Sequence, residues 1–250
     1  MKRIVTIILC LMWVVMIWAA ASTPWEEANK LYADKQYRDA AKKYEEILLN
    51  EGFSAELYYN LGNAYYKSNE IGLAILNYER ALRLKPLYAD AQHNLEFVNL
   101  RVIDKLEDEN TFFLRKWFNF ILKLRTPDQW LYIAVPLFVF SLAGFLMFVF
   151  GKTRLFRKGG FYAGLLSLIF SIAFVGFSTL RKGQLENHNQ GIILSGAVVV
   201  KGSPDKSGTD LFQLHEGTKV EIVGTLGEWN EIRLSNGSVG WLEIKHLGII

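Results

Sequence analysis

Two long runs without a charged residue, 130–150 and 159–180, occupy the middle of this chain of 250 residues. A helix of about 20 apolar residues, rising 1.5 Å per residue, is long enough to cross the hydrocarbon core of a bilayer. The sequence therefore predicts two transmembrane helices over these runs. The alternative is a pair of buried helices in a large soluble core, but such helices usually have shorter apolar runs and some polar residues.

The short segment between the two runs, 151–158, carries only basic charges. It contains Lys152, Arg154, Arg157 and Lys158 and no acidic residue. Because basic loops are retained in the cytoplasm, this segment is predicted to be a cytoplasmic loop. A helical hairpin returns the chain to the side it came from, so the segments before 130 and after 180 should both lie on the outer face.

The composition of the two runs favours helix packing over transport. Neither run has an ionisable residue, whereas a transporter or proton relay normally needs one. Small side chains allow two helices to approach closely. The small residues expected at the contact are Ala143, Gly144, Gly164, Ser167, Ser171 and Gly176.

The first 21 residues resemble a secretory signal. Lys2 and Arg3 precede an apolar run over 4–18, and three alanines end at Ala21, where we expect cleavage. An uncleaved anchor is the alternative and would leave the same topology. The single cysteine, Cys10, lies in this segment, so disulfides, thiol catalysis and cysteine metal sites are not expected in the mature chain. A net charge of +3 is too small to indicate nucleic-acid binding.

The segment between the signal and the first run contains an internal repeat of 34 residues. Equivalent residues include Ala28 and Gly62, Leu31 and Tyr65, Ala40 and Ala74, Tyr44 and Tyr78, and Leu48 and Leu82. Small residues at the helix contacts, tyrosines beside them and Pro86 at the end of the second unit resemble the tetratricopeptide repeat (TPR). We predict a TPR domain over 22–109, with repeats at 21–54 and 55–88 and a third, solvating helix over 87–109.

In TPR domains the first helix of each repeat lines a concave groove that binds peptides or helices, so the resemblance implies a groove here. The candidate groove residues are Trp25, Asn29, Tyr32, Glu56, Tyr59, Asn63, Tyr66 and Lys67. The alternative is that several of them pack against the third helix.

Residues 110–129 combine aromatic and basic side chains just before the first apolar run. Phe113, Trp117 and Phe120 alternate with cations such as Arg115 and Lys123. This pattern predicts an amphipathic helix in the outer membrane interface. Thr126, Pro127 and Asp128 then predict a sharp helix start.

After a predicted linker over 181–191, the apolar period changes from helical to two. Short strands, about five in number, and the Asn236-Gly237 hairpin signal favour a small barrel over 192–250. The Glu216-Gly217-Thr218-Lys219-Val220 turn and the closing Gly240-Trp241 resemble bacterial SH3-like domains, which often bind cell-wall peptides or glycans. Phe212, expected in a long loop, and Trp229 are the candidate ligand residues, whereas Trp241 is expected in the core.

Nothing in the sequence predicts catalysis. The four histidines are scattered, and none has a metal-binding spacing with an acid or another histidine. Neither a nucleophile elbow nor a phosphate-binding glycine loop is present. We therefore expect no enzyme activity, no metal and no cofactor.

The fold class is multi-domain: an all-α TPR solenoid, a transmembrane hairpin and a small all-β barrel. This order resembles the BatE-type proteins of bacterial aerotolerance operons. The resemblance implies a complex in the cell envelope whose partners include von Willebrand-type domain proteins and a MoxR-class ATPase. It also implies a multi-pass protein of the bacterial inner membrane, with both terminal domains in the periplasm.

The leading hypothesis is a scaffold that presents its groove and barrel to other membrane or periplasmic proteins. The alternative is an envelope tether or sensor that binds peptidoglycan through the SH3-like domain. An accessory subunit for cell-wall or cofactor assembly is a third possibility.

Overall fold

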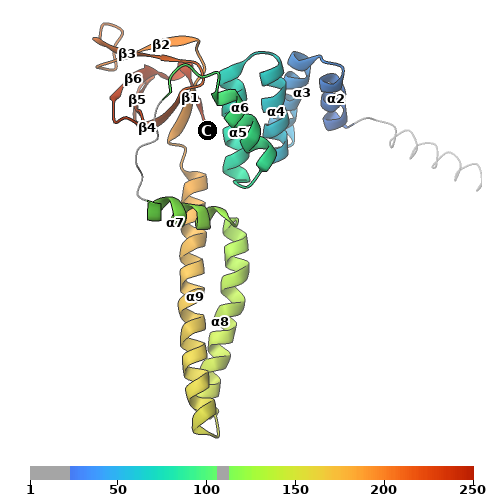
Figure 1. Ribbon diagram of the computed structural model, residues 1–250, viewed down its shortest axis with the longest axis vertical. Helices are drawn as coiled ribbons and strands as arrows, with labels where there is room; N and C mark the ends of the chain where they lie inside the picture. The colour runs from blue at the N-terminus through green and yellow to red at the C-terminus, as the bar shows by residue number, and fades with distance from the viewer. Residues whose placement is uncertain (1–22, 106–112) are drawn as a thin grey trace, which may run out of the picture.

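The structure is a computed structural model that describes residues 23–105 and 113–250. A layer of short helices lies beside an antiparallel sheet, and a long helical hairpin projects away from both (Figure 1). The predicted signal peptide, 1–21, lies outside the described residues. The helices before the hairpin are α2 (Pro24–Ala33), α3 (Tyr37–Asn50), α4 (Ala55–Lys67), α5 (Ile71–Leu84), α6 (Ala89–Asn99) and α7 (Phe113–Lys123).

The first four of these helices form two pairs with the same turn. Lys35 between α2 and α3 and Asn69 between α4 and α5 both have a positive φ, of 61° and 66°. The next residue in each turn, Gln36 or Glu70, donates its backbone N–H to a carbonyl in the preceding helix at 2.9 Å. Since Lys35 and Asn69 are 34 residues apart, the repeat seen in the sequence is also a repeat of backbone geometry.

Helix α6 is shorter than the predicted third helix, which was expected to reach 109. It ends at Asn99, and residues 106–109 lie outside the described part. The chain leaves the helix because Val102 and Asp104 turn toward the sheet. Val102 packs beside Gly217, and Asp104 accepts hydrogen bonds from the strand β3 (Asp210–His215) and from Thr218.

The hairpin consists of α8 (Pro127–Phe150) and α9 (Arg154–Glu186), and both are long and apolar enough to span a membrane. Thr126 caps α8 in a capping box with Gln129, as the predicted helix start required. Only 17% and 22% of their most apolar segments are buried, which contradicts the alternative of a buried pair in a soluble core.

The ends of α9 differ from the predicted boundaries. The predicted loop over 151–158 is shortened to 151–153. Thr153 caps α9, and the basic residues at 154, 157 and 158 belong to the first turns of this helix. The helix also runs six residues past the apolar run, so the predicted linker over 181–191 includes its last turns and the start of β1 (Gln190–Ile193). Arg181 explains part of this extension, since it donates a hydrogen bond to the carbonyl of Arg83 on α5.

Small residues bring α8 and α9 together, as predicted. A Cβ atom on Gly144 would lie 2.7 Å from the Cα of Gly164. Ser167 and Ser171 donate to carbonyls of α8 at 2.7 and 2.9 Å. The exposed Ala143 lies outside this contact, and so does Gly176, which was also expected there but has no atom within 4 Å of its Cβ position. Close backbone approach and interhelical hydrogen bonds are the interactions that hold helices together in a bilayer.

Helix α7 crosses the end of the hairpin beside α9 (Figure 1). Its Leu122 is buried and its carbonyl accepts from the indole of Trp130 at 3.3 Å. Phe118 packs edge-to-face on Phe177 of α9. The side chains of Trp117 and Phe120 remain 61% and 53% exposed, so α7 presents an aromatic face at one end of the hairpin.

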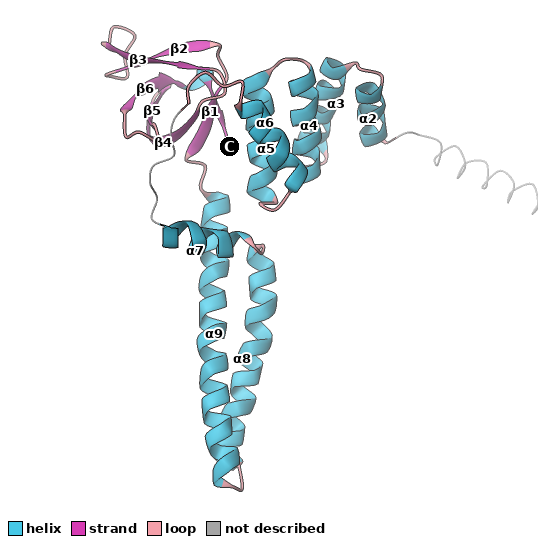
Figure 2. Cartoon of the chain, viewed as in Figure 1, coloured by secondary structure: helices cyan, strands magenta, loops and turns pink. Residues whose placement is uncertain are grey.

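The C-terminal part is a seven-stranded sheet in which every pairing is antiparallel (Figure 2). The strand order is β3-β2-β6-β5-β4-β1-β7, so β3 and β7 form its two edges and the predicted closed barrel is not shown. The remaining strands are β2 (Ala197–Lys201), β4 (Lys219–Leu226), β5 (Trp229–Arg233), β6 (Val239–Glu243) and β7 (Leu247–Ile249), with a short 3-10 turn, η1 (Ile244–His246), before β7.

The hairpin between β5 and β6 forms where Asn236-Gly237 predicted it, but with a different turn. Gly237 has a positive φ of 84°, whereas Asn236 does not. The N–H of Gly237 donates to the carbonyl of Leu234, and Asn236 Oδ1 accepts from the N–H of Ser238. One glycine in the left-handed region gives the strands their twist, so the asparagine can remain in an ordinary conformation.

The sheet packs directly on α5 and α6 (Figures 1 and 2). Ile192 and Ile250 share a buried cluster with Ile75 and Leu95. The sequence did not predict this contact. The sheet covers the side of the second helix pair where a further repeat would pack.

Three glycines allow this close approach. A Cβ atom at Gly248 would lie 2.5 Å from Leu76 Cδ2, and one at Gly72 would lie 2.9 Å from the carbonyl oxygen of Ile193. Gly217, whose φ is +87°, would place a Cβ atom 2.8 Å from Ile75 Cδ1. A larger side chain at any of these positions would separate the two parts.

Candidate protein-binding groove

The predicted groove residues lie on α2 and α4, beside a row of tyrosines. The phenol of Tyr44 donates to Asn29 Oδ1 at 2.6 Å, and the phenol of Tyr78 donates to Asn63 Oδ1 at 2.7 Å. Both bonds span 15 residues and are offset by one repeat. Each asparagine therefore has its oxygen committed to the fold, which leaves its amide hydrogens directed elsewhere.

Burial keeps these phenols protonated. Desolvation, followed by the nearby Tyr32, raises the pKa of Tyr44 to about 12. Desolvation also raises the pKa of Tyr78, which is among the largest fully buried side chains. Both hydroxyl groups consequently act as donors at any physiological pH, and the orientation of Asn29 and Asn63 is fixed.

The first helix pair places its three candidates around an accessible surface. Trp25 and Tyr32 are half-buried against the core of this pair, and Asn29 is exposed. Trp25 packs edge-to-face on Tyr44, and Tyr32 packs on Tyr37. Their remaining surfaces offer aromatic faces and an amide to an approaching chain.

The candidates of the second pair are more occupied. Glu56 forms an ion pair with Lys85 at 2.9 Å, which lowers the pKa of Glu56. Tyr59 packs on Tyr88 with ring centroids 5.0 Å apart. Asn63 also accepts a hydrogen bond from α6, where Asn94 Nδ2 lies 2.8 Å away.

Helix α6 covers part of the remaining candidates. The ring of Tyr66 contacts Phe97 at 6.1 Å, and the guanidinium of Arg101 lies 5.6 Å from its centre. Lys67 is exposed at the end of α4. The structure thus supports the alternative for Tyr59, Asn63 and Tyr66, which pack against α6 or its approach, and leaves the first pair and Lys67 open.

The candidate residues of the sheet lie on both of its faces. Phe212 lies in β3 and packs against the core, so its predicted place in a long loop is wrong. Trp229 and Trp241 are half-buried and alternate with the core residues Asn230 and Leu242, which places them on the opposite face of the sheet. The prediction that Trp241 lies in the core is therefore wrong. Trp241 belongs to β6, which pairs with β5, and each of these strands has one inward and one outward face.

Sequence reasoning missed the polar side of the sheet contact. Asp104 accepts from the N–H of His215 at 2.7 Å and from Thr218 Oγ1 at 2.6 Å, and His215 Nδ1 lies 2.8 Å from its other oxygen. Burial alone would raise the pKa of Asp104, but these hydrogen bonds hold it below its usual value. Lys219 forms an ion pair with Glu79 at 2.9 Å.

Within residues 23–105 and 113–250 no group of three histidine, cysteine or acidic side chains is placed to hold a metal ion. The side-chain clusters found on the helical layer consist of aromatic rings, amides and ion pairs. These groups are suited to recognition of another protein chain.

Comparison with known proteins bears on the second helix pair. A family model of the tetratricopeptide repeat matches residues 55–88. Those residues are a TPR. Its bounds contain α4 and α5 and end just before α6. A comparison with curated proteins found no match for the chain.

Proposed function

We propose that this protein is a non-enzymatic, membrane-anchored scaffold that binds other proteins through the open part of its groove, which consists of Trp25, Asn29, Tyr32 and Lys67. TPR units generally mediate contacts between proteins, and this chain contains one such unit and a second pair built to the same geometry. The hairpin α8–α9 would fix the groove at a membrane surface.

The observation that carries the proposal is the unequal covering of the two pairs. Helix α6 and the sheet cover the second pair, whereas the ring contacts and the hydrogen bond found for Trp25, Asn29 and Tyr32 on α2 are with α3 of the same pair. Half-buried aromatic rings beside oriented amides resemble the anchors of protein interfaces.

The proposed setting is the outer face of a bacterial inner membrane. The basic residues at the tip of the hairpin support this orientation, because Arg154, Arg157 and Lys158 lie together at the start of α9. The order of parts resembles the BatE-type proteins, and on that basis the proposed partners are membrane or periplasmic proteins, including those with von Willebrand-type domains.

The test is site-specific photocrosslinking in intact membranes. A photoreactive residue would replace Lys67, which is exposed at the open end of α4, and a matched one would replace Lys42 on α3, whose side chain is 73% exposed. We expect one dominant membrane or periplasmic protein to be captured from Lys67 and not from Lys42.

Charge reversal provides the competing control. Lys67→Glu should reduce co-purification of the same partner, and Lys42→Glu should leave it unchanged. Equal capture from both positions, or a partner retained by a folded Trp25→Ala, Lys67→Glu variant, would contradict binding through the groove.

Peptidoglycan binding through the sheet is a second candidate function. It is favoured by Trp229 and Trp241, which lie half-exposed on the outer face of β5 and β6. Because the sheet packs on α5, the test uses the full chain in detergent. Sedimentation with purified cell wall that is lost in Trp229→Ala would support it, and absence of sedimentation at low salt would exclude it.

A further inference from the structure

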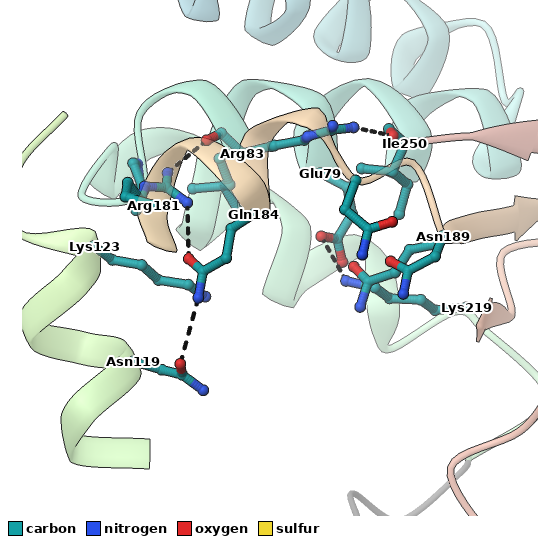
Figure 3. A pocket seen from close by; sticks show the side chains of 13 residues that line it. Glu79, Arg83, Asn119, Lys123, Arg181, Gln184, Asn189, Lys219 and Ile250 are labelled. Carbon is teal, nitrogen blue, oxygen red and sulfur yellow. Dashed lines mark hydrogen bonds and ion pairs between the residues drawn. The ribbon is translucent and has the colours of Figure 1, made fainter. Parts of the chain in front are cut away.

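A polar pocket of about 320 Å³ lies where the second helix pair, α7, the end of α9 and the sheet meet (Figure 3). Its wall carries four cationic side chains, Arg83, Lys123, Arg181 and Lys219, and one acidic side chain, Glu79. Each part of the fold contributes at least one of the cations. The pocket therefore exists only because the sheet is packed on the helices above the hairpin.

Two of the four cations are fully engaged within the fold, one by an acid and one by two backbone oxygens. Lys219 forms its ion pair with Glu79. Arg83 donates to the backbone oxygens of Leu185 and Ile250, which attaches the last turn of α9 and the end of the sheet to α5. The acidic side chain, Glu79, is thus already paired with Lys219, and no second carboxylate side chain lines the pocket.

Arg181 is buried without being fully bonded. Its side chain is only 4% exposed and donates to the carbonyl of Arg83 at 2.8 Å and to Gln184 Oε1 at 3.3 Å. Its Nε has no partner in the described structure. Burying a charged donor without a partner is costly, so this guanidinium is prepared for an acceptor that the chain itself does not supply.

Lys123 is the second available cation. It lies at the end of α7, and no hydrogen bond or ion pair to its ammonium is found in the residues that the structure describes. Much of the side chain is exposed, yet partial burial of the ammonium, followed by repulsion from Arg181 and Lys219, lowers its pKa. An anion bound between Lys123 and Arg181 would offset this repulsion and the cost of burying the ammonium.

The position of the pocket at the end of the apolar span indicates the chemical class of its ligand. Arg181 directly follows the predicted span 159–180, and α7 places its exposed aromatic rings at the same end of the hairpin. Charged groups one residue beyond an apolar span lie at the level of lipid headgroups. The side-chain amides of Asn119 and Gln184 add further donors, and Gln184 Nε2 donates to Asn119 Oδ1 at 3.5 Å.

We propose that this pocket binds a phosphate group between Arg181 and Lys123, supplied either by an anionic phospholipid of the outer leaflet or by a soluble phosphate. A planar guanidinium and an ammonium are the side chains best suited to phosphate oxygens. The bound group would join α5, α7, α9 and the sheet, and so fix the groove at a set height above the membrane.

Native mass spectrometry of the delipidated full chain tests the lipid source. Phosphatidylglycerol and phosphatidylcholine with identical acyl chains would be titrated in detergent. We expect one saturable phosphatidylglycerol, bound about fivefold more weakly by Lys123→Gln, since one cation near a lipid surface contributes about 1 kcal/mol. Arg181→Lys, which keeps the charge and loses the fork, should weaken it similarly.

Lys158→Gln is the matched control, because it removes one exposed positive charge at the far end of the hairpin. Inorganic phosphate against chloride, at equal ionic strength, tests the soluble source through the thermal unfolding midpoint. Stabilisation by phosphate that Lys123→Gln abolishes, without lipid preference, would assign a soluble ligand. Lipid binding reduced equally by Lys123→Gln and Lys158→Gln, or no response to either ligand, would overturn the proposal.

Discussion

The two helix pairs have the same interior and different surroundings. Their turns, their tyrosine–asparagine bonds and their buried small residues recur at an offset of 34 residues. On the outside of the second helix the equivalence ends. Where α3 has the exposed Arg38 and Lys42, α5 has Gly72 and the buried Leu76.

This difference shows how one repeat unit serves two purposes. The residues at the contact between the two helices of a pair are similar in both units of this chain. The residues on the outer side differ according to what packs there. At these two positions the first pair, which faces solvent, has charged side chains, and the second pair, which contacts the sheet, has none. The sheet thereby takes the place of a terminal capping repeat.

Exchanging the outer residues of the two pairs should give the largest effect. Leu76→Lys places an unpaired charge against Gly248, and we expect it to destabilise the chain by about 3–5 kcal/mol. The reciprocal Lys42→Leu should change stability by no more than about 0.5 kcal/mol. Urea unfolding in detergent measures both, and equal effects would contradict the comparison.

A larger side chain at the same contact should have the next largest effect on stability. Gly248→Val would place new methyl groups against Leu76 and Leu194, at a cost of up to about 3 kcal/mol. Gly196→Val is the control, since no atom lies within 4 Å of its Cβ position and its φ is ordinary. We expect limited proteolysis to cut between the helices and the sheet only in Gly248→Val.

Acid should weaken the contact between Asp104 and the sheet. Because the pKa of Asp104 is lower in the folded chain, its contribution is present above its unfolded value, about 3.9, and is lost as the pH falls through the folded value. Asp104→Asn should cost about 2 kcal/mol at pH 7, and this cost should shrink as the pH falls below about 3.9. A constant difference across this range, measured by thermal unfolding, would rule out the carboxylate's involvement.

The interior of the pairs should respond equally. Tyr44→Phe and Tyr78→Phe each remove one hydrogen bond to an asparagine, and each should cost about 1 kcal/mol. The measurement is again urea unfolding. A loss confined to Tyr78→Phe would mean that the first pair does not share the interior of the second.

The sequence predicted those features that depend on local periodicity. The 34-residue repeat, the two apolar helices, the capped start at Thr126 and the small contact residues Gly144 and Gly164 follow from spacing alone. The docking of the sheet could not be read in that way, because it joins α5 to residues more than 100 positions later. Its local signal was the difference between Arg38 and Lys42 in the first unit and Gly72 and Leu76 at the equivalent positions of the second.

The candidate site was predicted less completely than the fold. Spacing within a TPR indicates which residues face the groove, but it does not show whether α6 covers them, as it does Tyr66. The misplacement of Trp241 has a similar cause. In a short strand an aromatic residue fits either face, and only the neighbouring Leu242, which is buried, fixes the register.

Zero-length crosslinking with a carbodiimide in native membranes tests the central claim, that the sheet is packed on the second helix pair. This reagent joins carboxylates and amines already in contact, and Glu79 and Lys219 lie 2.9 Å apart. The Glu56–Lys85 ion pair, at the same distance within the helical layer, reports whether the reaction works. We expect both crosslinked peptides by mass spectrometry, with the first lost in Lys219→Gln. Recovery of Glu56–Lys85 alone would show that the sheet stands apart from the helices.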